Sequence, residues 1–90
     1  MENCFSDYAR SLIIELLENI DVYFSHDILN SEGRKIFSRL AYEILKSRPE
    51  YKKYIGRVWR KPTLDNVLKV AELILGEELY KVYMKNYVQF

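Results

Sequence analysis

The sequence has very little of the chemistry from which catalytic and metal sites are built. It contains one cysteine, Cys4, and one histidine, His26. A single cysteine cannot form an internal disulfide, which favours a reducing compartment. One Cys and one His also provide neither a zinc or haem site nor a serine triad or Cys/His nucleophilic pair. We therefore expect no metal ion, no cofactor and no catalytic residues, and a protein that is not an enzyme.

Loop-forming residues and long apolar runs are scarce as well. Three Gly and two Pro stand among 90 residues, of which 49% are hydrophobic and 30% charged. This composition predicts one globular domain over 1–90 and argues against an all-β sandwich. No apolar run approaches the roughly twenty residues that span a bilayer, and Glu2 and Asp7 stand where a signal peptide would be basic. We expect a soluble cytoplasmic protein without membrane contact, and the Tyr, Ile, Lys and Glu content favours a thermophilic source.

Positive charge is what the middle of the chain has in excess. The whole chain has a net charge of only +1. Residues 1–30 carry one Arg and six acids, net −5; residues 31–63 carry ten Lys/Arg and three Glu, net +7; residues 64–90 carry three Lys and four acids, net −1. Segregated positive charge of this kind is typical of a surface that binds a polyanion.

Apolar residues recur at helical spacing along most of the chain. They predict a first helix from Ser6 or Asp7 to about Phe24, followed by a loop in which Ile28 contacts the core. The expected fold class is all-α: a small domain of four to five helices with a helix-turn-helix-like core over 31–76. The C-terminal tail is expected to be helical or a short β segment that supports dimerisation.

Helix-start signals place the second and third helices. The second is expected to begin at Asn30 or Ser31. The third is expected to open with Ser47 as N-cap, Pro49 in the first turn and Glu50 completing a capping box.

The fourth and fifth helices follow from similar signals. Thr63 is the expected N-cap of the fourth helix and Gly76 its end, with Leu73 and Val70 standing off the buried face. That buried face comprises Leu64, Val67, Leu68, Ala71, Ile74 and Leu75. A fifth helix is expected to run to about Asn86, although residues 79–90 also suit a strand.

The second and third predicted helices each carry a basic face opposite the apolar one. On the second helix the face comprises Lys35, Arg39, Tyr42 and Lys46. On the third it comprises Lys52, Lys53, Gly56, Arg57 and Arg60, with no acid among them. Such a face is either a solvated surface or a binding site for a phosphate backbone. Gly56 would either let that backbone approach closely or end or kink a short helix.

The stretch from Leu40 to Ala71 resembles the helix-turn-helix of the Cro/phage-repressor family of DNA-binding domains. Residues that match the scaffold helix and the start of the recognition helix are Leu40, Ala41, Ile44, Ser47 and Arg48. Residues that match the next cap and helix are Pro62, Thr63, Leu64, Asp65, Val67, Leu68, Lys69, Val70 and Ala71. The chain departs from the family pattern in having Phe37 where a Gln is common and Leu45 in place of the turn Gly.

The resemblance implies that the third helix, at about 48–60, lies in the major groove of double-stranded DNA. Residues near its start would then face base edges, namely Arg48, Lys52 and Lys53. Phosphates would be contacted by Lys35, Arg39, Lys46, Arg57, Arg60 and Lys61. The implied function is that of a small transcription regulator, acting as a homodimer joined through its C-terminal segment.

Two other partners fit the same charge pattern. A small helical interaction module of the antitoxin, immunity or inhibitor type would use the basic face to bind an acidic protein. An RNA-binding helical domain would use Tyr42 and Trp59 beside that face.

Overall fold

Helices form nearly the whole structure, which confirms the all-α prediction. The computed structural model describes residues 5–87, with side chains described as far as Tyr83. In chain order the elements are α1 (Asp7–Glu18), α2 (Ile20–Tyr23), β1 (Phe24–Ser25), β2 (Ile28–Leu29), α3 (Ser31–Ser47), the 3₁₀ helix η1 (Pro49–Tyr51), α4 (Lys52–Arg60), α5 (Leu64–Leu75) and α6 (Glu78–Tyr87). Within this range there are six α-helices rather than the expected four or five. The predicted first helix is divided into α1 and α2, and the C-terminal segment forms the helix α6.

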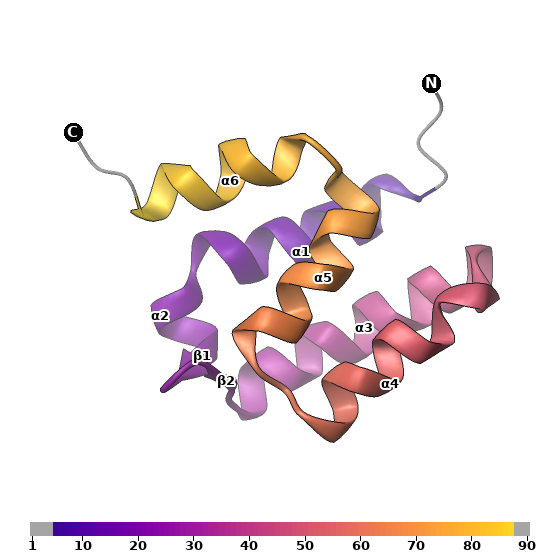
Figure 1. The fold of residues 1–90 in the computed structure, drawn as a ribbon, viewed down its shortest axis with the longest axis horizontal. Helices are drawn as coiled ribbons and strands as arrows, with labels where there is room; N and C mark the ends of the chain where they lie inside the picture. The colour runs from indigo at the N-terminus through magenta and orange to yellow at the C-terminus, as the bar shows by residue number, and fades with distance from the viewer. Residues whose placement is uncertain (1–4, 88–90) are drawn as a thin grey trace.

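The core is enclosed mainly by α1, α3 and α5, with α4 and α6 outside them (Figure 1). Apolar side chains at helical spacing form the buried stripes of α1, α3 and α5. Full burial of a Val, Leu, Ile or Phe side chain contributes about 1.5–3 kcal/mol. The largest fully buried side chains are Phe37, Ile13, Leu16, Leu17, Leu29, Leu40, Ile44, Val58, Val67 and Val70. On the outside, α6 lies along α1, where Arg10 and Glu78 form an ion pair.

The first helix ends earlier than predicted, although Ser6 caps it as expected by accepting a hydrogen bond from the Ala9 N–H. The helix breaks at Asn19, whose side chain donates to the Glu15 carbonyl at 3.0 Å and whose backbone leaves the helical region. Short amide side chains compete for backbone hydrogen bonds in this way. A single turn, α2, follows, and the Tyr23 hydroxyl donates back to the Glu15 carboxylate at 2.6 Å.

The segment predicted as a loop is a small antiparallel hairpin. His26 and Asp27 form its two-residue turn with φ values of 54° and 66°, the left-handed pair that such a turn requires. The prediction that Ile28 contacts the core was wrong: Ile28 is 43% exposed, whereas Leu29 is 2% exposed. Neighbouring residues of a strand face opposite sides, so a one-residue error in position exchanges the buried side chain.

Backbone hydrogen bonds join this hairpin to the connection between α4 and α5. The Leu29 N–H donates to the Pro62 carbonyl at 2.9 Å, and the Leu64 N–H donates to the Asp27 carbonyl at 2.8 Å. Ile28 and Thr63 form an isolated antiparallel bridge between these two bonds. The end of α4 is thus held against the start of α3.

The connection between α3 and α4 differs from the predicted capping box. Ser47 is the last residue of α3, so its backbone is helical and it cannot serve as an N-cap. Pro49 opens η1, a position that suits its missing N–H, and α4 starts only at Lys52. The chain then runs back beside α3 (Figure 1). The ring of Trp59 in α4 packs edge-on against that of Phe37 in α3.

The last two helices largely follow the prediction. Thr63 caps α5 by accepting a hydrogen bond from the Asn66 N–H at 3.3 Å, and Gly76 ends the helix with φ 57°. Val70 was expected to stand off the buried face but is fully buried, whereas Leu68 is half-buried. The reason is that α5 packs against α4, α1 and α6, which widens and rotates its buried stripe. The helical prediction for the C-terminal segment is confirmed by α6; residues 88–90 lie outside the described chain.

Candidate nucleic-acid interface

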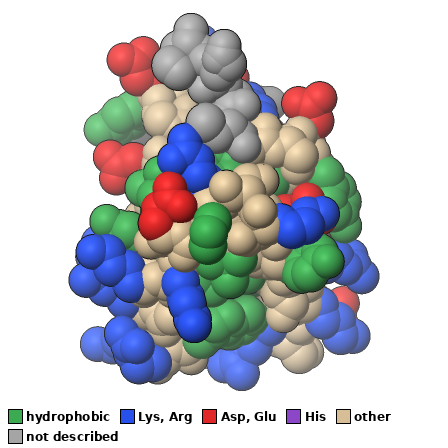
Figure 2. Space-filling view, turned by 90° about the vertical axis from the view of Figure 1, so that its right-hand side faces the viewer, with side chains coloured by type: hydrophobic (Ala, Val, Ile, Leu, Met, Phe, Trp, Pro, Cys, Tyr) green, Lys and Arg blue, Asp and Glu red, His purple; other side chains and the backbone are tan. Residues whose placement is uncertain are grey.

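The nine residues of α4 present four cations and no acid. Lys52, Lys53, Arg57 and Arg60 are all exposed, because the opposite face of the helix buries Ile55 and Val58. In the part of the chain that the structure describes, no carboxylate lies within ion-pair distance of these four cations or of the exposed Lys61 that follows them. Figure 2 shows Lys and Arg side chains gathered over the lower half of one face, with Asp and Glu mostly above them.

An aromatic ring orients two of the α4 cations. The Lys53 Nζ lies 5.5 Å from the centre of the Tyr54 ring, and the Arg57 guanidinium carbon lies 5.6 Å from it. Contacts of this kind at exposed sites are worth about 0.5–1 kcal/mol and leave the N–H donors free. Tyr54 therefore spaces two positive charges without neutralising them.

The basic face of α3 is partly neutralised. The Lys35 ammonium lies 3.2 Å from the Glu32 carboxylate, and the Lys46 ammonium lies 3.3 Å from that of Glu43. Arg39 stands between them, exposed, and no acid of the described residues pairs with it. Exposed pairs of this kind are worth little, at about 0–1 kcal/mol, so a phosphate could displace either carboxylate.

Arg48, one of the three residues expected to face base edges, is engaged inside the free protein. Its guanidinium donates to the Glu50 carboxylate at 3.0 Å and lies 5.9 Å from the centre of the Tyr51 ring. The Glu50 backbone N–H, and after it the Arg48 guanidinium, hold the pKa of the Glu50 carboxyl below its ordinary value. Glu50 thus partners Arg48 instead of completing a capping box.

Gly56 lies in the middle of the α4 basic face and does not end the helix, which continues to Arg60. A Cβ built there would meet nothing closer than the Arg60 Nη1 atom at 3.8 Å. No contact inside the described protein therefore requires glycine at this position. The prediction that a phosphate backbone approaches the helix closely at Gly56 would explain a glycine at this position.

Exposed aromatic rings lie beside these cations. Trp59 is 44% exposed and packs edge-on against Phe37, with ring centres 5.2 Å apart. Tyr42 on α3 is 66% exposed, and the Lys46 Nζ lies 5.1 Å from its ring centre.

A hollow that the sequence did not predict opens between α1 and α3. It has a volume of about 460 Å³ and is lined by Tyr8, Ser38, Arg39, Tyr42 and Glu43. Tyr8 was missed because it comes from the first helix, and no spacing within that helix indicates which residues of α3 lie opposite. The predicted cation Arg39 and the aromatic Tyr42 are brought together here.

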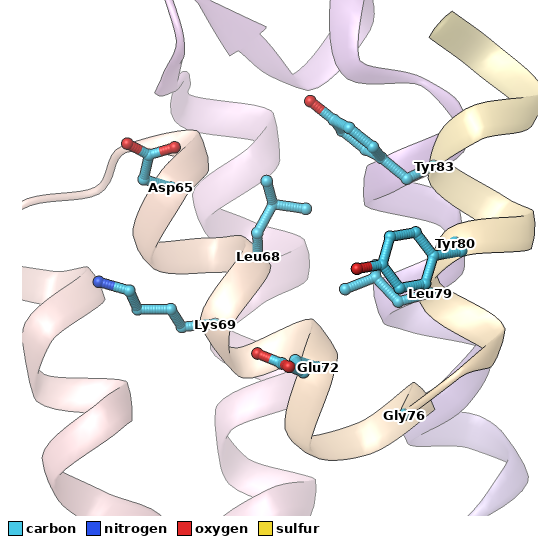
Figure 3. Close-up of a pocket in the computed structure, with 8 residues that line it drawn as sticks. All are labelled: Asp65, Leu68, Lys69, Glu72, Gly76, Leu79, Tyr80 and Tyr83. Carbon is cyan, nitrogen blue, oxygen red and sulfur yellow. The ribbon is translucent and has the colours of Figure 1, made fainter. Parts of the chain in front are cut away.

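A second pocket, of about 420 Å³, lies between α5 and α6 (Figure 3). Unlike the basic faces, it is lined mainly by apolar and aromatic side chains. Its walls are Leu68 from α5 and Leu79, Tyr80 and Tyr83 from α6, and Figure 3 shows both Tyr side chains pointing toward α5. The lining also includes two acids and one Lys: Asp65, Glu72 and Lys69. An anionic partner would gain little binding energy in this pocket, whereas an apolar partner would gain from burying its surface against the Leu and Tyr side chains.

Among residues 5–87 as described, no three His, Cys, Asp or Glu side chains come together as a metal site would require. No described helix is long and apolar enough to cross a membrane.

Comparison with protein-family models, with curated proteins and with solved structures found no match for this chain.

Proposed function

We propose that this protein binds double-stranded DNA through the basic face of α4 and acts in the cytoplasm as a small transcription regulator. The observation that carries the proposal is the set of four exposed α4 cations, none with a carboxylate partner among the described residues. Each phosphate that such a cation neutralises releases a condensed counterion, which is the main source of affinity for duplex DNA.

The two basic helices contribute differently to this binding. On α4 the cations are available at once, so Arg57, Arg60 and Lys61 contact phosphates while Lys52 and Lys53 reach base edges. On α3, Lys35 and Lys46 must first leave Glu32 and Glu43. Arg39 is the α3 cation that needs no such exchange.

Arg48 has to exchange partners before it can read a base. Its pairing with Glu50 orients the guanidinium in the free protein but also neutralises it. Arg48 therefore adds to specificity only after the first phosphate contacts have formed.

Dimerisation through the C-terminal helix completes the proposal. The pocket between α5 and α6 is apolar at its walls, and Tyr80 beside it is 73% exposed. Its rim carries both signs of charge, so a second copy related by two-fold symmetry can pair each Lys69 with an acid of its partner. A symmetric dimer would present two α4 helices to half-sites about one helical turn apart.

The test is a fluorescence-anisotropy titration of a labelled mixed-sequence duplex at several salt concentrations. We expect a log-log slope of roughly −4 or steeper, because each phosphate contact adds about −0.9. The double variant Lys52→Glu/Lys53→Glu should lose binding. For a matched comparison, Lys53→Glu should weaken binding, whereas Lys81→Glu, the same change at an exposed position of α6, should change it little.

An acidic protein partner is the rival to this proposal. If the wild-type chain does not bind duplex even at low salt, the proposal is wrong, and the basic face has to be explained by an acidic protein or by a nucleic acid other than duplex DNA. If the double variant binds as tightly as the wild type, the choice of α4 as the interface is wrong.

A further inference from the structure

We infer that the hollow between α1 and α3 is a stacking site for an unpaired nucleobase, so that the nucleic acid bound by this protein includes a single-stranded segment. The inference rests on the proposed function and names the substrate class of the neighbouring surface. It goes beyond duplex binding because the feature that carries it is aromatic rather than basic.

Two exposed tyrosine rings line the hollow. Tyr8 is 49% exposed and Tyr42 is 66% exposed, and both line the same hollow from different helices. Large aromatic side chains gain from burial, so two of them left open beside one hollow favour an apolar or flat ligand. The hollow is open to solvent, which suits a flat ligand laid against the rings.

Two cations, Arg39 and Lys46, lie beside these rings. Arg39 lines the hollow, and in the described part of the chain no carboxylate pairs with it. The Lys46 ammonium lies over the Tyr42 ring and is held there by Glu43 as well. A flat ring with a phosphate attached, which is what a nucleotide offers, matches aromatic walls with a free guanidinium at the edge.

Glu43 also lines the hollow, and its carboxylate is paired with the Lys46 ammonium at 3.3 Å. Carboxylate oxygens accept hydrogen bonds, so a donor such as the N–H of a base edge suits the position beside Glu43. A base placed this way has its ring between the tyrosines and its phosphate toward Arg39.

A base inside a duplex cannot use this site. Its faces are covered by stacking on its neighbours, and only an unpaired base can offer them to a side chain. The hollow therefore selects nucleic acid in which an unpaired segment adjoins the duplex that α4 holds.

The experiment compares three labelled DNA ligands: a blunt duplex of about 20 base pairs, the same duplex with about six unpaired nucleotides added at one 3′ end, and the single strand alone. The wild-type chain should bind the extended duplex on the order of tenfold more tightly than the blunt one, as expected for stacking of one base. Tyr8→Leu, at a position outside the basic faces of α3 and α4, keeps apolar bulk but removes the ring, and it should reduce that ratio toward one while leaving blunt-duplex affinity unchanged. Tyr42→Leu should reduce the ratio as well. Tyr80→Leu, at an exposed tyrosine of α6, is the matched control and should keep the ratio.

The binding results distinguish failure of the stacking site from failure of duplex binding by α4. If blunt duplex binds and the extension adds no affinity, the stacking site is wrong while duplex binding stands. If extended and single-stranded DNA bind but blunt duplex does not, the stacking site stands and the duplex proposal is wrong. If Tyr8→Leu leaves the ratio of extended to blunt duplex affinity at its wild-type value, or if none of the three ligands binds, the inference is overturned.

Discussion

The backbone carbonyl of Tyr23 occupies the space in which a side chain on Gly33 would begin. A Cβ built at Gly33 would stand 2.4 Å from the Tyr23 oxygen and 2.8 Å from the Leu29 Cδ2 atom. The same carbonyl accepts a hydrogen bond from the Asn30 N–H at 2.9 Å, and the Asn30 side chain caps α3 at the Gly33 N–H. The end of α2 and the start of α3 are thus in direct contact through backbone atoms.

Replacing Gly33 with Ala should destabilise the protein. The added methyl group cannot fit without moving backbone, and overpacking of this kind costs about 1–3 kcal/mol, more than the gain in helix propensity of roughly 0.5–1 kcal/mol. Thermal unfolding followed by circular dichroism would measure the loss. An unchanged or higher Tm for G33A would show that this contact is looser than described.

Replacing Gly56 with Ala should have the opposite effect on stability and a separate effect on binding. Space is open around Gly56, so alanine should stabilise α4 by about 0.5–1 kcal/mol. If a phosphate backbone approaches this glycine closely, G56A should weaken duplex binding in spite of the added stability. Equal or tighter binding by the stabilised variant would remove the argument for close approach, and Gly33→Ala serves as the comparison in which stability falls.

Removing the charge of Glu50 should strengthen duplex binding. The Glu50→Gln variant is expected to bind duplex DNA more tightly than the wild type, because it removes a negative charge near the start of α4 and weakens the charge-assisted hydrogen bond that neutralises Arg48. An anisotropy titration at one salt concentration would test this. Weaker binding by E50Q would mean that Arg48 acts only when Glu50 orients it.

The same pair predicts a dependence of stability on pH. The folded-state pKa of Glu50 is lowered, so its contribution is present above the unfolded pKa and is lost as pH falls through the folded pKa. Wild type should therefore be more stable than E50Q at neutral pH, and the difference should shrink as the solution becomes acidic. Urea unfolding of both proteins at neutral and acidic pH would show the trend; a difference that grows on acidification would contradict it.

Substitution in the α5–α6 pocket should control the oligomeric state. Tyr80→Glu places a charge on the exposed wall of that pocket and should shift a dimer toward monomer in size-exclusion chromatography with light scattering. Tyr8→Glu makes the same change at an exposed tyrosine of α1 and should leave the dimer intact. A wild-type chain that stays monomeric at high concentration would contradict the proposed dimer itself.

Local signals were enough to predict most helix ends. Ser6, Thr63 and Gly76 act where the sequence placed them, because a capping side chain or a left-handed glycine needs only its own helix. The N-cap prediction for Ser47 was wrong because Ser47 is itself the last helical residue of α3, and a separate 3₁₀ helix intervenes before α4.

Features that depend on contact between distant segments could not be predicted. The burial of Val70 follows from three helices packing around α5, and the hollow beside Tyr42 follows from α1 lying against α3. The set of unpaired cations on α4 lies between these cases. Its residues follow from helical spacing alone, whereas their lack of acidic neighbours depends on where the rest of the chain lies.

The two hydrogen bonds between the hairpin and the α4–α5 connection use only main-chain atoms. Every amino acid brings a carbonyl, and every one except proline brings an N–H, so these bonds do not depend on which side chains stand at the donor positions. The side chains of the donors Leu29 and Leu64 lie in the core, so each residue fixes the connection twice, through its N–H and through its packing. The exposed cations of α4 take part in neither contact, so a change of charge on the proposed binding surface leaves the attachment of α4 in place.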